Sequence, residues 1–245
     1  MCTVTYIPTS TGFYFTSSRD EKASRDTLCP ALYENGGIQL VYPKDALAGG
    51  TWIASSLNGK TACLLNGAFV NHVKKENYAR SRGLILLESF KYSDANELYN
   101  TIDIENVEPF TLLLLNYTSG HLTAFDEFRW DGVHKHLKKL DTKTPQIWSS
   151  ATLYNPSVQL KREGLFNQWI NKHADFVDAM ILDFHNRKHG LANSEDLLMK
   201  GEGDLMTLSI SQIHFNEGEA LFNYHDIIQN KLHTVKLNQK EVVHV

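Results

Sequence analysis

MCTVTYIPTSTGFYFTSSRDE, residues 1–21, opens the chain with two runs of β-branched and aromatic residues, at 2–7 and 13–18. The segment between them runs from Pro8 to Gly12 and contains the residue types that favour turns. Two such runs around a turn predict an antiparallel hairpin. The sequence therefore predicts that the N-terminus is tied into a β-sheet.

The register of this hairpin brings charged residues to the start of the chain. If the chain turns near Ser10, facing residues have numbers that add to about 20 or 21, so Cys2 lies opposite Ser18 or Arg19. The tripeptide 19–21, Arg-Asp-Glu, is then beside the terminus. A guanidinium can favour a thiolate, and a carboxylate can hold an ammonium group or orient an amine. The alternative is a solvated charged turn, the usual fate of such runs.

Cys2 is the candidate nucleophile. Aminopeptidases remove Met1 when the next residue is small, and cysteine qualifies, so the mature chain would begin with a free α-amino group on Cys2. A thiol has a pKa of about 8.5 and an α-amine one of about 7.7 to 8.0, so both groups can act near neutral pH. The amine can accept the thiol proton and later pass it to a leaving amine. The alternative is a buried strand residue behind a retained Met1.

A second hairpin supplies a candidate oxyanion hole. Residues 51–55 and 60–65 flank Asn58-Gly59, a dipeptide typical of type I′ turns. A hairpin centred there places Asn66 opposite Thr51, with Gly67 next. The Asn66 side-chain amide and the Gly67 backbone N–H are donors of the kind that stabilise a tetrahedral intermediate. An ordinary turn is the alternative.

The remaining pattern alternates between helices and strands. Residues 19–50 predict a long loop region with one strand at 38–42. Antiparallel hairpins separated by paired helices predict an α+β fold in which two antiparallel sheets pack together with helices outside, in a single domain over 1–245. Helices are expected after Ser81, after Ser93, from Asn155-Pro156 to about 173 and over 176–184, and further strands at 110–117, 121–130, 133–140, 205–215 and 219–238.

Composition narrows the function classes. The 245 residues include 42% hydrophobic and 21% charged residues and carry a formal net charge of -4, which does not favour nucleic acid as a partner. Three cysteines without a C-x-x-C pair predict no disulfide framework. No signal peptide or apolar run long enough for a membrane span is expected, which predicts a cytoplasmic protein.

Either of two histidine pairs could supply half of a metal site. His134 and His136 alternate on one predicted strand, and His185 and His189 are one helical turn apart. No carboxylate motif completes either pair, so exposed histidines and no metal are predicted. Cys29 and Cys63 are predicted as a loop thiol and a sheet-core residue. The aromatic stripe of Phe166, Trp169 and Phe176 predicts helix packing against a sheet, with a lipid or haem pocket as the alternative.

These residues carry a family resemblance. Met1-Cys2 followed by a hairpin that ends in Ser17-Ser18-Arg19-Asp20-Glu21 resembles the N-R-D-E signature of the NRDE (Tango2-like, transport and Golgi organisation 2) family. That family is similar to amidohydrolases that begin with cysteine, such as choloylglycine hydrolase and penicillin V acylase, which implies an Ntn-hydrolase-like four-layer αββα sandwich. Further matching landmarks are Gly49-Gly50-Thr51-Trp52, Leu65-Asn66, Ser81-Arg82-Gly83 and Thr207-Leu208-Ser209.

The resemblance implies a cysteine Ntn-type amidohydrolase that needs no cofactor and cleaves non-peptide C–N (amide) bonds of a small molecule. The alternative is a non-enzymatic Tango2-like protein that binds or traffics a hydrophobic ligand such as haem or an acyl lipid. Two departures from the pattern are Ser18 in place of the signature asparagine and the lack of an arginine near 207–209. The expected catalytic residues are Cys2, Arg19, Asp20 and Asn66, and the expected substrate-binding residues are Glu21, Gly67, Trp52, Ser81 and Arg82.

Overall fold

The computed structural model describes residues 3–118, 121–173 and 175–237. Within these ranges the strands form two antiparallel sheets. The first has the order β10-β1-β2-β11-β12-β13 and the second the order β3-β4-β5-β6-β7-β8-β9. The strands of the first sheet are β1 (Thr3–Pro8), β2 (Gly12–Lys22), β10 (Gln146–Ser149), β11 (Leu205–Asn216), β12 (Glu219–Asp226) and β13 (Lys231–Lys236). Those of the second are β3 (Thr27–Asn35), β4 (Ile38–Asp45), β5 (Ile53–Ser56), β6 (Lys60–Asn66), β7 (Phe110–Tyr117), β8 (Leu122–Trp130) and β9 (Lys135–Lys139).

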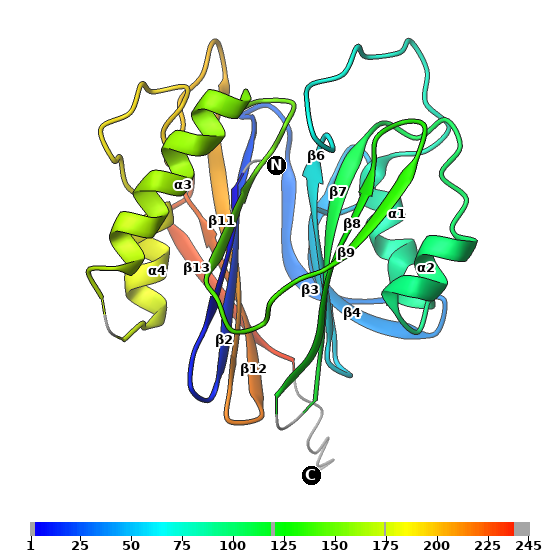
Figure 1. The fold of residues 1–245 in the computed structure, drawn as a ribbon, viewed down its shortest axis with the longest axis horizontal. Helices are drawn as coiled ribbons and strands as arrows, with labels where there is room; N and C mark the ends of the chain where they lie inside the picture. The colour runs from blue at the N-terminus through cyan, green and yellow to red at the C-terminus, as the bar shows by residue number, and fades with distance from the viewer. Residues whose placement is uncertain (1–2, 119–120, 174, 238–245) are drawn as a thin grey trace.

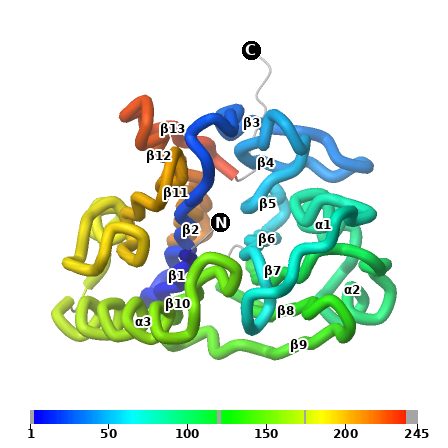
Figure 2. The backbone as a smooth tube through the Cα atoms, turned by 90° about the horizontal axis from the view of Figure 1, so that it is seen from above, coloured from blue at the N-terminus to red at the C-terminus, as the bar shows by residue number. Residues whose placement is uncertain are grey.

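Helices cover the outer face of each sheet. The helices α3 (Pro156–Ile170) and α4 (Asp178–His185) lie outside the first sheet, and α1 (Arg82–Glu88) and α2 (Ala95–Thr101) lie outside the second (Figure 1). A short 3-10 helix, η1 (Ser89–Lys91), follows α1. Seen from above, the two sheets face each other between these helical layers (Figure 2). The predicted α+β fold with four layers in the order αββα is confirmed.

Aromatic side chains fill the space between the two sheets. The ring of Phe125, on β8, lies 4.7 Å from that of Tyr6 on β1 and 5.7 Å from that of Trp148 on β10. Phe13 on β2 packs against Tyr117 on β7, with ring centroids 5.5 Å apart. All five side chains belong to or pack against one hydrophobic cluster that both sheets share, so burial of apolar area holds the sheets together.

A second cluster lies between the first sheet and its helices. Phe166 and Trp169 of α3 and Phe184 of α4 pack against Ile7 and Tyr14 of the first hairpin. The predicted role of the aromatic stripe, packing against a sheet, is therefore confirmed. No helix in the described ranges is long and apolar enough to cross a membrane.

The first hairpin has one of the two predicted registers. Thr3 faces Ser18, so the numbers of facing residues add to 21. Side chains alternate along β2 because successive residues of a strand point to opposite faces. Arg19 consequently faces the space between the sheets, where its guanidinium lies 4.6 Å from the Trp52 ring, and Asp20 faces the helical layer.

Two predictions about this part of the chain are wrong, namely the long loop over residues 19–50 and the position of Cys29 in a loop. Residues 19–50 are not a long loop, because β2 extends to Lys22 and β3 adds an edge strand that contains Cys29. A shift in the pairing of β3 with β4 falls between Leu28 and Ala31, around Pro30, which has no N–H to donate. This edge strand is only partly buried, and its sequence lacks the alternation of apolar and polar residues that predicts a strand.

The second hairpin is shifted by one residue from the prediction. Ile53 faces Cys63, so Asn66 is not opposite Thr51. Gly59 has a φ of 89°, but Asn58 is not among the residues with positive φ. A type I′ turn needs positive φ at both positions, and the loop instead has three residues, 57–59, between Ser56 and Lys60.

Three of the helix starts were predicted to within one residue, and α4 begins two residues later than predicted. Ser81 and Asn155 are the N-caps of α1 and α3, and the Asn155 side chain accepts a hydrogen bond from the backbone of Val158. The second short helix is capped by Asp94 instead of Ser93. Asp94 accepts hydrogen bonds from two backbone N–H groups of the first turn, which a carboxylate does at least as well as a hydroxyl.

Candidate functional site

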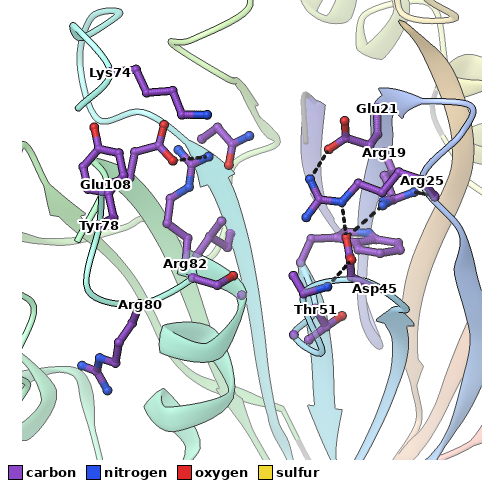
Figure 3. A pocket seen from close by; sticks show the side chains of 17 residues that line it. Arg19, Glu21, Arg25, Asp45, Thr51, Lys74, Tyr78, Arg80, Arg82 and Glu108 are labelled. Atoms are coloured by element: carbon purple, nitrogen blue, oxygen red, sulfur yellow. Dashed lines mark hydrogen bonds and ion pairs between the residues drawn. The ribbon is translucent and has the colours of Figure 1, made fainter. Parts of the chain in front are cut away.

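A pocket with a volume of about 390 Å³ lies where β5 begins and β6 ends, beside the N-terminus of α1. The residues of one wall lie on β2 and between β2 and β5. Those of the other wall lie between β6 and α1, at the start of α1 and just before β7 (Figure 3). Its described lining residues are Arg19, Glu21, Arg25, Asp45, Ala48, Gly50, Thr51, Trp52, Leu64, Asn66, Lys74, Tyr78, Arg80, Ser81, Arg82, Gly83 and Glu108.

Asp45 organises the first wall. Its Oδ2 accepts a hydrogen bond from Nη2 of Arg19 at 3.2 Å and lies 2.7 Å from Nε of Arg25. Its Oδ1 accepts the backbone N–H groups of Leu47 and Ala48. The carboxylate is thus held on both sides and fixes two guanidinium groups at the pocket (Figure 3).

Arg19 is the most deeply buried cation of this wall. It is 2% exposed, and burial lowers the pKa of its guanidinium despite the opposing charge of Asp45. The flat face of the guanidinium packs on Trp52, and Nη1 donates to the backbone carbonyl of Arg25. Because Arg19 is rigidly held on all sides, it can present a fixed positive charge to the space beside it.

The opposite wall is built around Glu108. Its two carboxylate oxygens lie 3.0 Å from Nη2 of Arg82 and 3.2 Å from Nε2 of His72. Arg82 also donates to the Pro109 carbonyl, and burial lowers its pKa while Glu108 raises it. This second ion pair faces the first across the pocket (Figure 3).

Asn66 lines the pocket at the end of β6, as expected for a residue that polarises a carbonyl group. Gly67 does not line it. The Gly67 N–H already donates to the Pro109 carbonyl at 2.9 Å, and its φ of 81° requires glycine or a strained residue. From this dipeptide, the Asn66 side chain therefore remains as the donor for a substrate.

Asp20 lies on the other face of β2, away from the pocket lining. Its Oδ2 accepts a hydrogen bond from the Tyr154 hydroxyl at 2.8 Å, and its Oδ1 accepts one from Thr207 at 2.6 Å. The fully buried Arg162 stacks 3.5 Å above the Tyr154 ring and donates to the Thr3 hydroxyl. This polar network joins Asp20 to the first described residue of β1.

The structure thus brings together six of the predicted site residues. Cys2, the expected nucleophile, lies outside the described residues. Asp20 and Gly67 each follow a pocket residue in the sequence, but they do not line the pocket themselves. The lining residues that were predicted as site residues are Arg19, Glu21, Asn66, Trp52, Ser81 and Arg82.

Sequence reasoning missed Arg25, Asp45, Lys74 and Glu108. Asp45 is 26 residues from Arg19 and lies in the region expected to be a loop, so nothing suggested the pair. The one available signal was its place at the end of a strand, just before Gly49-Gly50. Lys74 and Glu108 come from irregular segments without a local pattern.

The histidines considered as metal ligands have other partners. His185 was expected to be exposed but is fully buried, and its two ring nitrogens lie 2.8 Å from the hydroxyls of Thr5 and Ser18. Burial lowers its pKa to about 3, so the ring is neutral. His136 pairs with Asp131 at 2.8 Å. Among the described residues, no group of three or more His, Cys, Asp or Glu side chains is placed to hold a metal ion.

Solved structures with a similar fold include two variants of one hydrolase. A conjugated bile acid hydrolase from Clostridium perfringens, crystallised as a variant with its second residue changed from cysteine to alanine, matches with a TM-score of 0.59 and 11% identity over 98% of this chain and 94% of that one. A second variant of that enzyme, with an arginine changed to leucine, matches with a TM-score of 0.57 at 11% identity and the same coverage. The fold is therefore that of the Ntn hydrolases.

Sequence comparison gives the family. No curated protein matches the chain significantly. The family model described as Transport and Golgi organisation 2 matches residues 1–216. The match covers most of the chain, including both walls of the pocket and the network around Asp20. The chain belongs to the Transport and Golgi organisation 2 family.

Proposed function

We propose that this protein is a cysteine amidohydrolase of the Ntn type, which cleaves a non-peptide C–N bond of a small substrate with Cys2 as its nucleophile. The observation that carries the proposal is the fixed, buried guanidinium of Arg19. Arg19 follows Ser18 on β2, and Ser18 pairs with Thr3, the residue directly after Cys2 in the chain. A positive charge in this place favours a thiolate over a thiol.

The fold supports the same proposal. The similar bile acid hydrolase was crystallised with its cysteine at position 2 replaced by alanine, and this chain also has cysteine at position 2. At 11% identity the likeness concerns the fold alone, so the reaction rests on the residues of this chain.

The reaction would run in two stages. The Cys2 α-amine takes the thiol proton, and the thiolate sulfur attacks the amide carbon, forming a C–S bond. The Asn66 amide donates to the oxyanion that develops on the former carbonyl oxygen. The C–N bond then breaks as the amine nitrogen takes the proton, which leaves a thioester. Water attacks the thioester carbon, and a carboxylic acid and the free thiol result.

Asp20 would hold the α-amine in position for this proton transfer. The Tyr154 and Thr207 hydroxyls each donate to one of its oxygens, so the orientation of the carboxylate is set by two strands and a loop. Asp20 is 2% exposed, and a buried carboxylate with two hydroxyl donors is a strong acceptor for a cation.

Intact-mass spectrometry of the protein from a cytosolic host tests the proposal. A brief low dose of iodoacetamide at neutral pH is expected to add one label, mapped to Cys2, on a chain that lacks Met1. The other two cysteines are internal controls. Cys63 is fully buried and burial raises its pKa to about 12, so it should not react in the native state, and Cys29 is partly buried.

An Arg19→Gln variant is expected to slow labelling of Cys2 without changing that of Cys29. Retained Met1, or preferential labelling of Cys29, would refute the nucleophile. That result would favour the alternative, a non-enzymatic protein that carries haem or an acyl lipid. The charged walls of the pocket argue against a purely apolar ligand. A cytoplasmic location remains a prediction.

A further inference from the structure

The charges that line the pocket do not balance. Five described cationic side chains and three carboxylates line it, whereas the protein as a whole has a formal net charge of -4. A cleft lined by an excess of one sign of charge attracts ligands of the opposite charge. The cations are Arg19, Arg25, Lys74, Arg80 and Arg82, and the carboxylates are Glu21, Asp45 and Glu108.

Most of these cations already form ion pairs with carboxylates of the protein. Arg19 and Arg25 share Asp45, and Arg25 also pairs with Glu21 at 3.1 Å. Arg82 pairs with Glu108. Each of these ion pairs keeps its partners in place, so the charges of these residues largely cancel.

Lys74 has no such partner. Among the described residues it forms no ion pair, and its ammonium group extends toward the space between the two walls (Figure 3). Arg80 differs, because it turns away from the pocket and donates to Glu88 and to the Asp103 carbonyl. Lys74 is thus the cation whose charge is left for a ligand.

Trp52 does not add a group for a ligand to match. It is 4% exposed and lines the pocket, and its ring lies 4.6 Å from the Arg19 guanidinium. Its Nε1 atom is itself buried and has no acceptor among the described residues, so this atom is not presented to the pocket. The unmatched charge of the pocket is therefore the ammonium group of Lys74.

We propose that the pocket binds an amide substrate that carries a carboxylate, with Lys74 pairing with that carboxylate. The ion pair of Arg82 and Glu108 holds the wall beside Lys74. The inference rests on the proposed function only for the scissile amide, because binding of the carboxylate does not require that Cys2 react.

The test uses two probes that differ in charge alone, N-benzoylglycine and N-benzoylglycinamide, titrated calorimetrically into the full chain with Cys2→Ala, which cannot turn over. We expect the carboxylate to bind at least about fivefold more tightly than the carboxamide, as for one partly exposed ion pair. Adding Lys74→Gln should remove most of that preference. Lys75→Gln, the matched control, changes the net charge equally at a neighbouring residue that does not line the pocket.

Equal binding of both probes, binding of neither, or an equal loss in the two lysine variants would overturn the inference. A preference for the carboxylate in protein whose wild type retains Met1 or fails to label at Cys2 would sustain the binding site while refuting the hydrolase. The two proposals can therefore fail separately.

Discussion

Arg19 and Asp20 are adjacent residues that are buried on opposite faces of one strand. Arg19 lies against Trp52 and Asp45 between the sheets, and Asp20 lies against Tyr154 and Thr207 under the helices. Both side chains are 2% exposed. A buried charge is costly unless it is paired, so the residues around each of these charges are needed for folding.

His185 makes the stability of the fold depend on pH. Its pKa is lowered by burial first and by the charges of His189 and Arg162 next, to about 3 in the folded chain. An unfolded histidine takes up a proton near pH 6.5. Stability due to neutral His185 is therefore complete above pH 6.5 and falls by about 1.4 kcal/mol per pH unit as the pH drops toward 3.

Urea unfolding at pH 7.5 and 5.5 measures this loss. We expect a His185→Gln variant, which keeps an amide donor and acceptor for Thr5 and Ser18, to be less stable at pH 7.5 but to lose less stability at pH 5.5 than the wild type. The exposed His121→Gln is the control. A wild-type stability that is the same at both pH values would contradict the burial of a neutral ring.

At the scale of elements, two glycines allow the start of α1 to lie directly against the backbone at Thr51. A Cβ atom on Gly83 would lie 2.9 Å from the Thr51 amide nitrogen and carbonyl oxygen, and one on Gly50 would lie 2.7 Å from the Gly83 carbonyl carbon. Backbone thus meets backbone, which only glycine permits. The contact brings Ser81 and Arg82 to the pocket, beside Trp52.

Gly83→Ala is therefore expected to lower the free energy of unfolding by about 1 to 3 kcal/mol through overpacking. It should also weaken binding of N-benzoylglycine, because Arg82 and Glu108 move with the start of α1. The matched control is Gly164→Ala in α3, where a Cβ would meet nothing within 4 Å. That change should stabilise the helix by about 0.5 to 1 kcal/mol. Equal effects of the two changes would show that the contact does not seat α1.

Strong local patterns made most elements predictable. The first hairpin, the meander of β7 to β9, the start of α3 at Asn155 and the turn at Glu217-Gly218 all follow from alternation, caps and turn residues near in sequence. β3 was missed because an edge strand buries too little to need an apolar pattern. The second hairpin was misplaced by one residue because the same Asn-Gly dipeptide fits loops of two or three residues.

Residues of the candidate site were predictable only where hairpin pairing or a family landmark pointed to them. Pairing across a hairpin placed Arg19 near the terminus, and family landmarks indicated Trp52, Ser81 and Arg82. Asp45, Lys74 and Glu108 reach the pocket through long-range packing of a strand end and two irregular segments. Nothing in their local sequence encodes that meeting, since it depends on how the whole second sheet is placed.

At the scale of the whole molecule, the shared aromatic core couples the two sheets. Phe125 reaches from the second sheet to Tyr6, Phe15 and Trp148 of the first. If the chain is a single domain, loss of the Phe125 contacts must destabilise both sheets at once.

Phe125→Ala is expected to cost about 3 to 5 kcal/mol, since it leaves a cavity between the sheets. Tryptophan fluorescence and far-ultraviolet circular dichroism should shift together to lower denaturant. Leu47→Ala, at a side chain that is 84% exposed, should change stability by less than about 0.5 kcal/mol. Two separated transitions in either variant would show that the sheets unfold independently.

The alternation of β2 has a genetic consequence. Loss of a single codon between Gly12 and Ser18 would shift every later residue of the strand by one place and turn each side chain to the opposite face. Arg19 would then face the helical layer and Asp20 the space between the sheets. Each side chain would meet partners suited to the opposite charge. Short in-frame deletions here should therefore harm the protein as much as a truncation, although they remove a single residue.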